Sequence, residues 1–209
     1  MEELKDELKK MPVTACLMLA NLIVFLIVDF TGGTENTVHM IACGAGYGPL
    51  ITEAGEWYRL FTSMFLHFGI AHLANNMLVL FVLGQRLEPA VGGVRYLLIY
   101  LLSGFGGNWI SLGLEMKSSN YAVSAGASGA VFGVMGAMIY VILRNKGRVA
   151  DLSVKKMLIM AAFSLYFGFT STGVDNAAHV GGMLCGFLAA FLLYHPGKGI
   201  ARMIRNTEP

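Results

Sequence analysis

Long stretches without a charged residue constrain the fold of this chain more than any other feature. An α-helix needs about 20 residues to cross the roughly 30 Å hydrocarbon core of a bilayer. Asp, Glu, Lys and Arg make up only 13% of the sequence, whereas a typical soluble domain has roughly 25%. The uncharged intervals long and apolar enough to be spans are 11–28, 60–85, 96–114, 118–143, 157–174 and 176–197. The sequence therefore predicts an all-α integral membrane protein with six transmembrane helices.

Basic residues alternate between the two sides of these predicted spans. Of the 15 Lys and Arg residues, only Arg59 and Lys117 fall in connections on one side, and the other 13 lie on the opposite side. Short loops rich in Lys and Arg stay in the cytoplasm during insertion. We therefore expect both termini to be cytoplasmic, with a short N-terminal arm (1–11), a membrane domain (12–195) and a basic tail (196–209).

The first external connection, residues 29–65, is the one long loop that these spans leave. It includes an uncharged interval, 36–52, which is interpreted as loop because small and rigid residues interrupt it: Gly44, Gly46, Gly48 and Pro49. Trp57 and Tyr58 beside Arg59 form an amphipathic cluster suited to the membrane interface. Long loops are usually functional or partly folded, so we expect structure in this one.

Polar residues inside the predicted spans are site candidates, because such groups are costly in hydrocarbon. They concentrate at the start of three spans, in segments 67–76, 126–133 and 175–182. Ser128 lies 15 residues before Leu143, and His179 lies 15 residues before Tyr194, both toward the cytoplasmic ends of their spans. At about 1.5 Å per residue, both side chains are expected roughly 8 Å below the outer edge of the hydrocarbon core.

Small residues at four-residue spacing predict that the helices carrying Ser128 and His179 pack closely. Helix pairs in membranes approach through such ridges. One ridge comes from the fourth interval and one from the sixth, and their members are Gly129, Gly133, Ala137, Ala178, Gly182 and Gly186. A serine hydroxyl and an imidazole on these helices are therefore expected within hydrogen-bonding reach.

This pairing suggests acyl-transfer chemistry. A neutral imidazole can remove the proton of a serine hydroxyl, which is otherwise a weak nucleophile. Ser128 follows Gly126 at a helix start, where backbone N–H groups are free to stabilise an oxyanion. His72 and Asn76, four residues apart on one helix face, are further donors. His179 is the expected base.

Other interpretations of these residues remain open at this point. A lone serine in a membrane helix usually bonds its own backbone, and a membrane histidine often bridges helices or carries protons. A small transporter using His67, His72 and His179 is one alternative. The 13 methionines are scattered and are interpreted as apolar filler rather than soft-metal ligands. No metal and no cofactor are expected.

At these residues the sequence resembles the rhomboid family of intramembrane serine proteases. The similarity extends over residues 12–195, and the Trp57-Tyr58-Arg59 segment resembles an element of the family's large first loop. The other matching motifs are Gly126-Ala127-Ser128-Gly129, His72-x-x-x-Asn76, and Ala178-His179 followed by Gly182 and Gly186. The resemblance implies a six-helix rhomboid-like bundle.

The resemblance also implies roles for individual residues. Ser128 would be the nucleophile and His179 the base and then the acid, in a dyad without an acidic member. His72, Asn76 and the Ser128 N–H would bind the oxyanion, and Phe132 would pack against the imidazole of His179.

Two further polar residues are interpreted differently. Asp175 precedes His179 by four residues, and we expect it to be a helix N-cap rather than the third member of a triad. His67 is expected to line the cavity or to steady the first loop, without a chemical step.

The implied activity is cleavage of transmembrane segments of other proteins near the outer face of the membrane, with a small side chain before the scissile bond. The partners would be such substrates and the lipid bilayer, with no nucleic acid. A proteolytically inactive relative that binds membrane clients is the main rival. We expect a retained first span and no transit peptide, hence a prokaryotic inner membrane.

Overall fold

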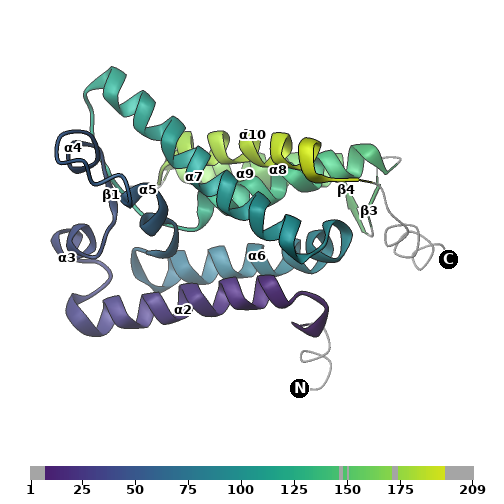
Figure 1. The fold of residues 1–209 in the computed structure, drawn as a ribbon, viewed down its shortest axis with the longest axis horizontal. Coiled ribbons are helices and arrows are strands. Elements are labelled where there is room, and N and C mark those ends of the chain that lie inside the picture. Colours follow the sequence, from purple (N-terminus) through teal and green to yellow (C-terminus); the bar gives the residue numbers. More distant parts are fainter. Residues whose placement is uncertain (1–7, 146–147, 150, 171–173, 196–209) are drawn as a thin grey trace.

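The computed structural model describes residues 8–145, 148–149, 151–170 and 174–195. The expected basic tail, 196–209, and residues 1–7 of the expected N-terminal arm lie outside these ranges. The described chain is an elongated bundle of helices (Figure 1). The start of the first long helix and the end of the last lie toward the same end of this bundle, on the right in Figure 1.

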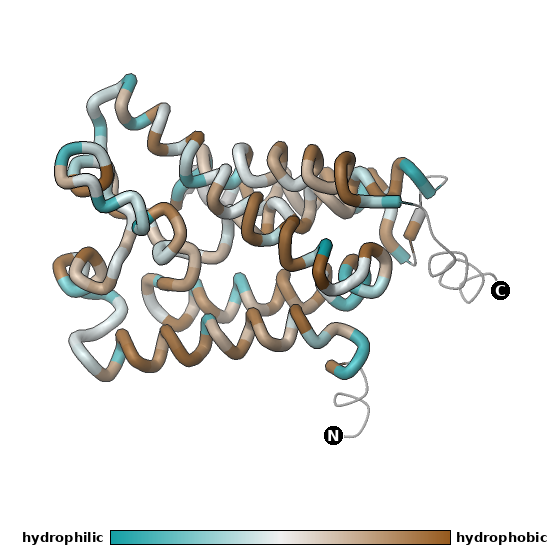
Figure 2. Tube along the Cα trace, in the orientation of Figure 1, coloured by the Kyte–Doolittle hydropathy of each residue, from teal (hydrophilic) through white to brown (hydrophobic). Residues whose placement is uncertain are grey.

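Six long helices form the bundle in the described part of the chain, and each corresponds to one predicted interval. They are α2 (Pro12–Gly32), α6 (Gly69–Val91), α7 (Gly93–Ser118), α8 (Ser128–Arg144), α9 (Val154–Thr170) and α10 (Asn176–Leu193). By length and composition, α2, α6, α7 and α10 are able to cross a membrane. Helices α8 and α9 are shorter, with 17 residues each. Apolar residues predominate along α2, as Figure 2 shows.

Two of the predicted spans begin too early. The interval 60–85 starts within α5 (Arg59–Thr62) and continues through a 3-10 turn, η1 (Ser63–Phe65), before α6 begins. The interval 118–143 starts with an extended segment that contains β2 (Val123–Ser124), so α8 begins only at Ser128. Absence of charge shows which residues lipid tolerates, whereas glycines with unusual backbone angles decide where these helices begin. Gly69, with φ of 73°, opens α6, and Gly126, with φ of 149°, precedes α8.

The connection between α2 and α6, residues 33–68, keeps the name first external loop from its predicted side of the membrane, and it is partly folded, as expected. It contains α3 (Thr37–Ala42), β1 (Gly46–Tyr47) and α4 (Gly48–Thr52) before α5 and η1. Strand β1 pairs antiparallel with β2, with Gly46 opposite Ser124 and Tyr47 opposite Val123. This pairing joins the loop directly to the segment that leads into α8.

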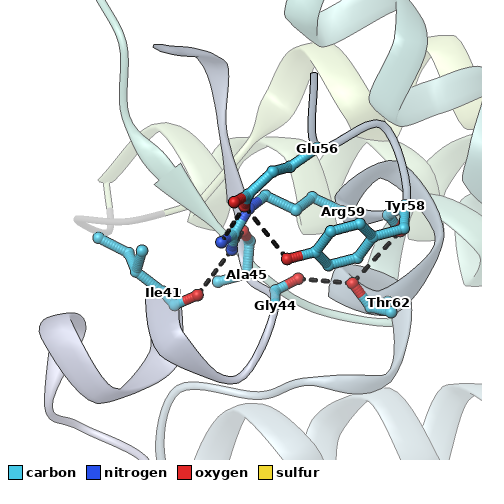
Figure 3. Close-up of polar contacts among 7 residues, drawn as sticks. All are labelled: Ile41, Gly44, Ala45, Glu56, Tyr58, Arg59 and Thr62. Carbon is cyan, nitrogen blue, oxygen red and sulfur yellow. Dashed lines mark hydrogen bonds and ion pairs between the residues drawn. The ribbon is translucent and has the colours of Figure 1, made fainter. Parts of the chain in front are cut away.

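A buried arginine holds the turns of this loop together (Figure 3). Arg59 is only 4% exposed. Its Nη1 donates to the carbonyl oxygens of Ile41 at 2.6 Å and Ala45 at 3.0 Å, and its Nε donates to Glu56 at 2.6 Å. The Thr62 hydroxyl donates to the Gly44 carbonyl at 2.7 Å. Side-chain donors therefore satisfy the backbone carbonyls that an irregular loop leaves unpaired.

The centre of the bundle is a seam between α8 and α10, with α7 packed against both. The small-residue ridges predicted from the sequence meet here. A Cβ atom added at Gly186 would overlap the Gly133 carbonyl oxygen, and one added at Gly182 would overlap the Gly129 carbonyl oxygen. The two backbones are therefore in direct contact along the helices that carry Ser128 and His179.

A buried carboxylate attaches α2 to the rest of the bundle. Glu88 of α6 is 2% exposed and accepts hydrogen bonds from the backbone N–H groups of Val13 at 2.9 Å and Thr14 at 2.7 Å. It also accepts from the Thr14 hydroxyl at 2.7 Å. These N–H groups belong to the first turn of α2 and have no partner within the helix, so Glu88 is an N-terminal cap supplied by another helix.

A short hairpin connects α8 and α9 at the other end of the bundle from the first loop. Strand β3 (Arg148–Val149) pairs antiparallel with β4 (Leu152–Ser153). Arg86 at the end of α6 donates from Nε to Asp151 in this hairpin at 2.7 Å. An exposed ion pair therefore joins α6 to the connection that precedes α9.

Candidate active site

Ser128 is the first residue of α8. The two residues before it are held by the first external loop: the Gly126 N–H donates to the Ser63 carbonyl at 2.9 Å, and the Ala127 N–H donates to His67 Nε2 at 3.3 Å. The first helical hydrogen bond of α8 runs from the Val131 N–H to the Ala127 carbonyl. The N–H of Ser128 thus lies at a helix start, where backbone donors have no partner within the helix.

His179 lies in the first turn of α10 and is 5% exposed. Its ring stacks on Phe132 of α8, with 4.3 Å between ring centroids and 8° between planes, which confirms the contact that the family resemblance implies. Its Nδ1 atom is buried and has no hydrogen-bond partner in the described part of the chain. The imidazole is therefore held by aromatic packing rather than by a carboxylate.

Asp175 is the N-cap of α10, as predicted. One carboxylate oxygen accepts from the Ala178 N–H at 2.8 Å, and the other accepts from the Ser111 hydroxyl at 2.6 Å. Both oxygens are therefore engaged in fixing the start of α10 and joining it to α7. This arrangement leaves no contact between Asp175 and the Nδ1 atom of His179.

His72 and Asn76 are one turn apart on α6, and the Asn76 amide donates to the His72 carbonyl at 3.2 Å. Gly126 lies between His72 and Ser128. A Cβ atom on Gly126 would be 2.8 Å from Cε1 and 3.0 Å from Nε2 of His72, and 3.4 Å from the Ser128 hydroxyl oxygen. Only glycine leaves room here, so the imidazole of His72 lies close to the Ser128 hydroxyl.

Five of the six predicted site residues line one cavity of about 340 Å³. They are His72, Asn76, Ser128, Phe132 and His179. Gly126 lines a smaller adjoining cavity together with His72 and Ser128. The structure thus brings together residues of α6, α8 and α10. The first and the last of them, His72 and His179, are more than 100 positions apart in the sequence.

The cavity combines polar and apolar side chains. Its described lining contains histidine, asparagine and serine side chains among apolar ones, and no Asp, Glu, Lys or Arg. Among the described residues, no group of three His, Cys, Asp or Glu side chains is placed to hold a metal ion. A hydroxyl, two imidazoles and an amide around a space for a substrate backbone are suited to nucleophilic attack and oxyanion binding.

Of the two positions predicted for His67, lining the cavity or steadying the first loop, the first is wrong. This side chain is 1% exposed and does not line the main cavity. Instead it contacts the residue before Ser128 and packs edge-on against His72, with 5.2 Å between ring centroids. The loop that it contacts is therefore the one leading into α8, 60 positions later in the chain.

Comparison with known proteins assigns this chain to a family. The family model of the rhomboid domain matches residues 54–196. The chain therefore belongs to the rhomboid family, as its motifs predicted.

Several curated proteins are similar to this chain. Rhomboid protease GluP of Bacillus subtilis (strain 168) is 40% identical over 189 residues, which are 90% of this chain and 36% of that protein. RHOMBOID-like protein 6, mitochondrial, of Arabidopsis thaliana is 40% identical over 86% of this chain and 57% of its own length. Putative rhomboid protease YdcA of Bacillus subtilis (strain 168) is 34% identical over 66% of this chain and 68% of its own length. The chain thus spans about a third to two thirds of these relatives.

Proposed function

We propose that this protein is an intramembrane serine endopeptidase that cleaves transmembrane segments of other membrane proteins. The observation that carries the proposal is a single cavity lined by the hydroxyl of Ser128 and by the imidazoles of His179 and His72. Membership of the rhomboid family, with relatives named as proteases, supports the same activity.

In the proposed mechanism, Ser128 attacks the scissile carbonyl while His179 takes the hydroxyl proton. The protonated His179 then gives that proton to the leaving amine, and a water molecule hydrolyses the acyl-enzyme by the same steps. The N–H of Ser128 and the side chains of His72 and Asn76 bind the oxyanion. The stacking of Phe132 on His179 orients the base, so that a dyad operates without an acidic third residue.

The proposed membrane architecture has six spans, formed by α2, α6, α7, α8, α9 and α10, with both termini in the cytoplasm. The distribution of Lys and Arg supports this orientation, because 13 of 15 fall on one side of the six spans. The site then faces the external side. We assign the protein to the inner membrane of a prokaryote.

The proposed substrates are helices that unwind near the outer face of the bilayer. An intact transmembrane helix uses every carbonyl in its own hydrogen bonds, so its peptide bonds are not accessible to a nucleophile. Helix-breaking residues expose them, and the resemblance to the rhomboid family implies a small side chain before the scissile bond. Partners are therefore transmembrane proteins and the surrounding lipid.

Cleavage of a model transmembrane substrate in liposomes tests this function. Wild-type protein is compared with Ser128→Ala and His179→Ala, and a fluorophosphonate probe is applied to the same samples. We expect cleavage and labelling in the wild type and loss of both in each variant. Folded wild-type protein that neither cleaves nor labels would contradict the proposal and favour a client-binding relative.

A further inference from the structure

His67 contacts two parts of the proposed oxyanion site at once. Its Nε2 accepts the Ala127 N–H at 3.3 Å, and its ring packs edge-on against the ring of His72. Ala127 precedes the proposed nucleophile, and its peptide is followed directly by the Ser128 N–H. The buried side chain of His67 therefore contacts both the segment that leads to the Ser128 N–H and the ring of His72.

The hydrogen bond to Ala127 defines the protonation state of His67. A backbone N–H can only donate, so Nε2 must be unprotonated to accept it, and the proton of the neutral ring is on Nδ1. Burial, followed by the charge of the neighbouring His72, lowers the pKa of His67 to about 3. The ring is therefore neutral at pH 7 and able to hold the Ala127 N–H.

The segment that contains His67 is itself anchored to α7. The Asn108 amide donates to the Leu60 carbonyl at 2.8 Å and to the Ser63 hydroxyl at 3.1 Å. The Ser63 carbonyl in turn accepts the Gly126 N–H at 2.9 Å. Two consecutive N–H groups before Ser128 are thus bonded to one short segment, which a membrane helix holds in place.

We propose that His67 is a positioning residue that aligns the loop before Ser128 and the ring of His72, and so sets the geometry of the oxyanion site. This inference rests on the proposed protease function. His67 does not touch the substrate or exchange protons with it. Since oxyanion donors act on the transition state, misalignment lowers kcat and leaves KM nearly unchanged.

Side chains of matched size test this role. The substitution His67→Gln places an acceptor oxygen near the position of Nε2, whereas His67→Leu has similar bulk and no acceptor. We expect His67→Leu to lower kcat by about 10- to 100-fold with KM unchanged, and His67→Gln to remain within about threefold of the wild type. His39→Leu is the control, because His39 also lies in the first loop but bonds to Val28 and Thr31, away from the cavity.

Hydrogen exchange measures the contact independently of activity. Mass spectrometry of the peptide covering residues 124–128 is expected to show faster exchange of the Ala127 amide in His67→Leu, and wild-type exchange in His67→Gln and His39→Leu. The midpoint of thermal unfolding in detergent is expected to be equal in the three variants. This result would distinguish a positioning role from a general loss of fold.

Equal losses of kcat in the Leu and Gln variants would overturn the inference, and so would unchanged exchange at Ala127. It would also be overturned if His67→Leu changed KM alone, or if its loss of activity were explained by lower thermal stability. A wild-type protein that does not cleave contradicts the proposed function instead. In that case the exchange measurement still decides whether His67 holds the loop before Ser128.

Discussion

The seam between α8 and α10 and the first external loop are stabilised by opposite means. Along the seam, glycines let two helix backbones touch, and nearly all contacts are between groups without charge. In the loop, a buried guanidinium and a threonine hydroxyl donate to backbone carbonyls. A helix satisfies its own backbone, so it needs only close packing in lipid, whereas an irregular loop must find donors for its carbonyls.

This difference explains how one site is built from both regions. The seam fixes the positions of Ser128 and His179 relative to each other, because the helices that carry them cannot slide without backbone collision. The loop fixes the N–H groups before Ser128 through Ser63 and His67. Variants that affect one region alone should therefore have separable effects on stability and on catalysis.

The largest expected effect is at the seam. In Gly186→Ala the new methyl group overlaps the Gly133 carbonyl oxygen, which belongs to a helix backbone and cannot move aside. We expect a loss of about 3 kcal/mol or more in the free energy of unfolding, as in overpacked cores. Equilibrium unfolding in mixed micelles measures it.

The matched control is Gly113→Ala in α7, where an added Cβ meets no atom within 4 Å. There we expect a small gain, up to about 1 kcal/mol, because alanine favours the helix. Equal stability of the two variants would show that α8 and α10 are not in backbone contact.

The next largest effect is expected in the loop. Arg59→Met keeps the length and the apolar part of the side chain but removes the donors to Ile41, Ala45 and Glu56. Unpaired buried carbonyls cost about 1 to 3 kcal/mol each, and partial access of water to Glu56 reduces the total. We expect a loss of about 2 kcal/mol, with faster amide exchange concentrated in residues 37–47.

Arg95→Met serves as the control for the loop variant. Arg95 is exposed and, among the described residues, donates only to the Val91 carbonyl at 3.3 Å, so its removal should change stability by less than about 0.5 kcal/mol. Similar losses in both variants, or exchange that increases evenly over the bundle, would mean that Arg59 does not hold the loop in particular.

The same contrast explains what the sequence alone could predict. The two small-residue ridges follow from periodicity within single helices, so counting was sufficient to predict them. The hydrogen bonds of Arg59 to the carbonyls of Ile41 and Ala45, and the contact of His67 with Ala127, join residues 14 to 60 positions apart in irregular segments. No local pattern encodes such contacts. For the same reason the starts of α6 and α8 were missed, since Gly69 and Gly126 set them by conformation rather than by polarity.

The smallest effect is expected at Asp175, the N-cap of α10. Asparagine is as good an N-cap as aspartate, and its amide can still pair with the Ser111 hydroxyl, which both donates and accepts. Asp175→Asn should therefore change stability by less than about 0.5 kcal/mol, whereas Asp175→Ala should lose about 1 kcal/mol.

Catalysis gives the sharper test of Asp175. Where an acid orients a catalytic histidine, converting that acid to the amide lowers kcat by about 10⁴-fold. The carboxylate of Asp175 instead bonds to Ala178 and Ser111, and the Nδ1 atom of His179 has no partner in the described chain. We therefore expect the kcat of Asp175→Asn to equal that of the wild type, measured by cleavage of the model substrate. A fall of several orders of magnitude would establish a triad, because packing against Phe132 would then be insufficient to orient the base.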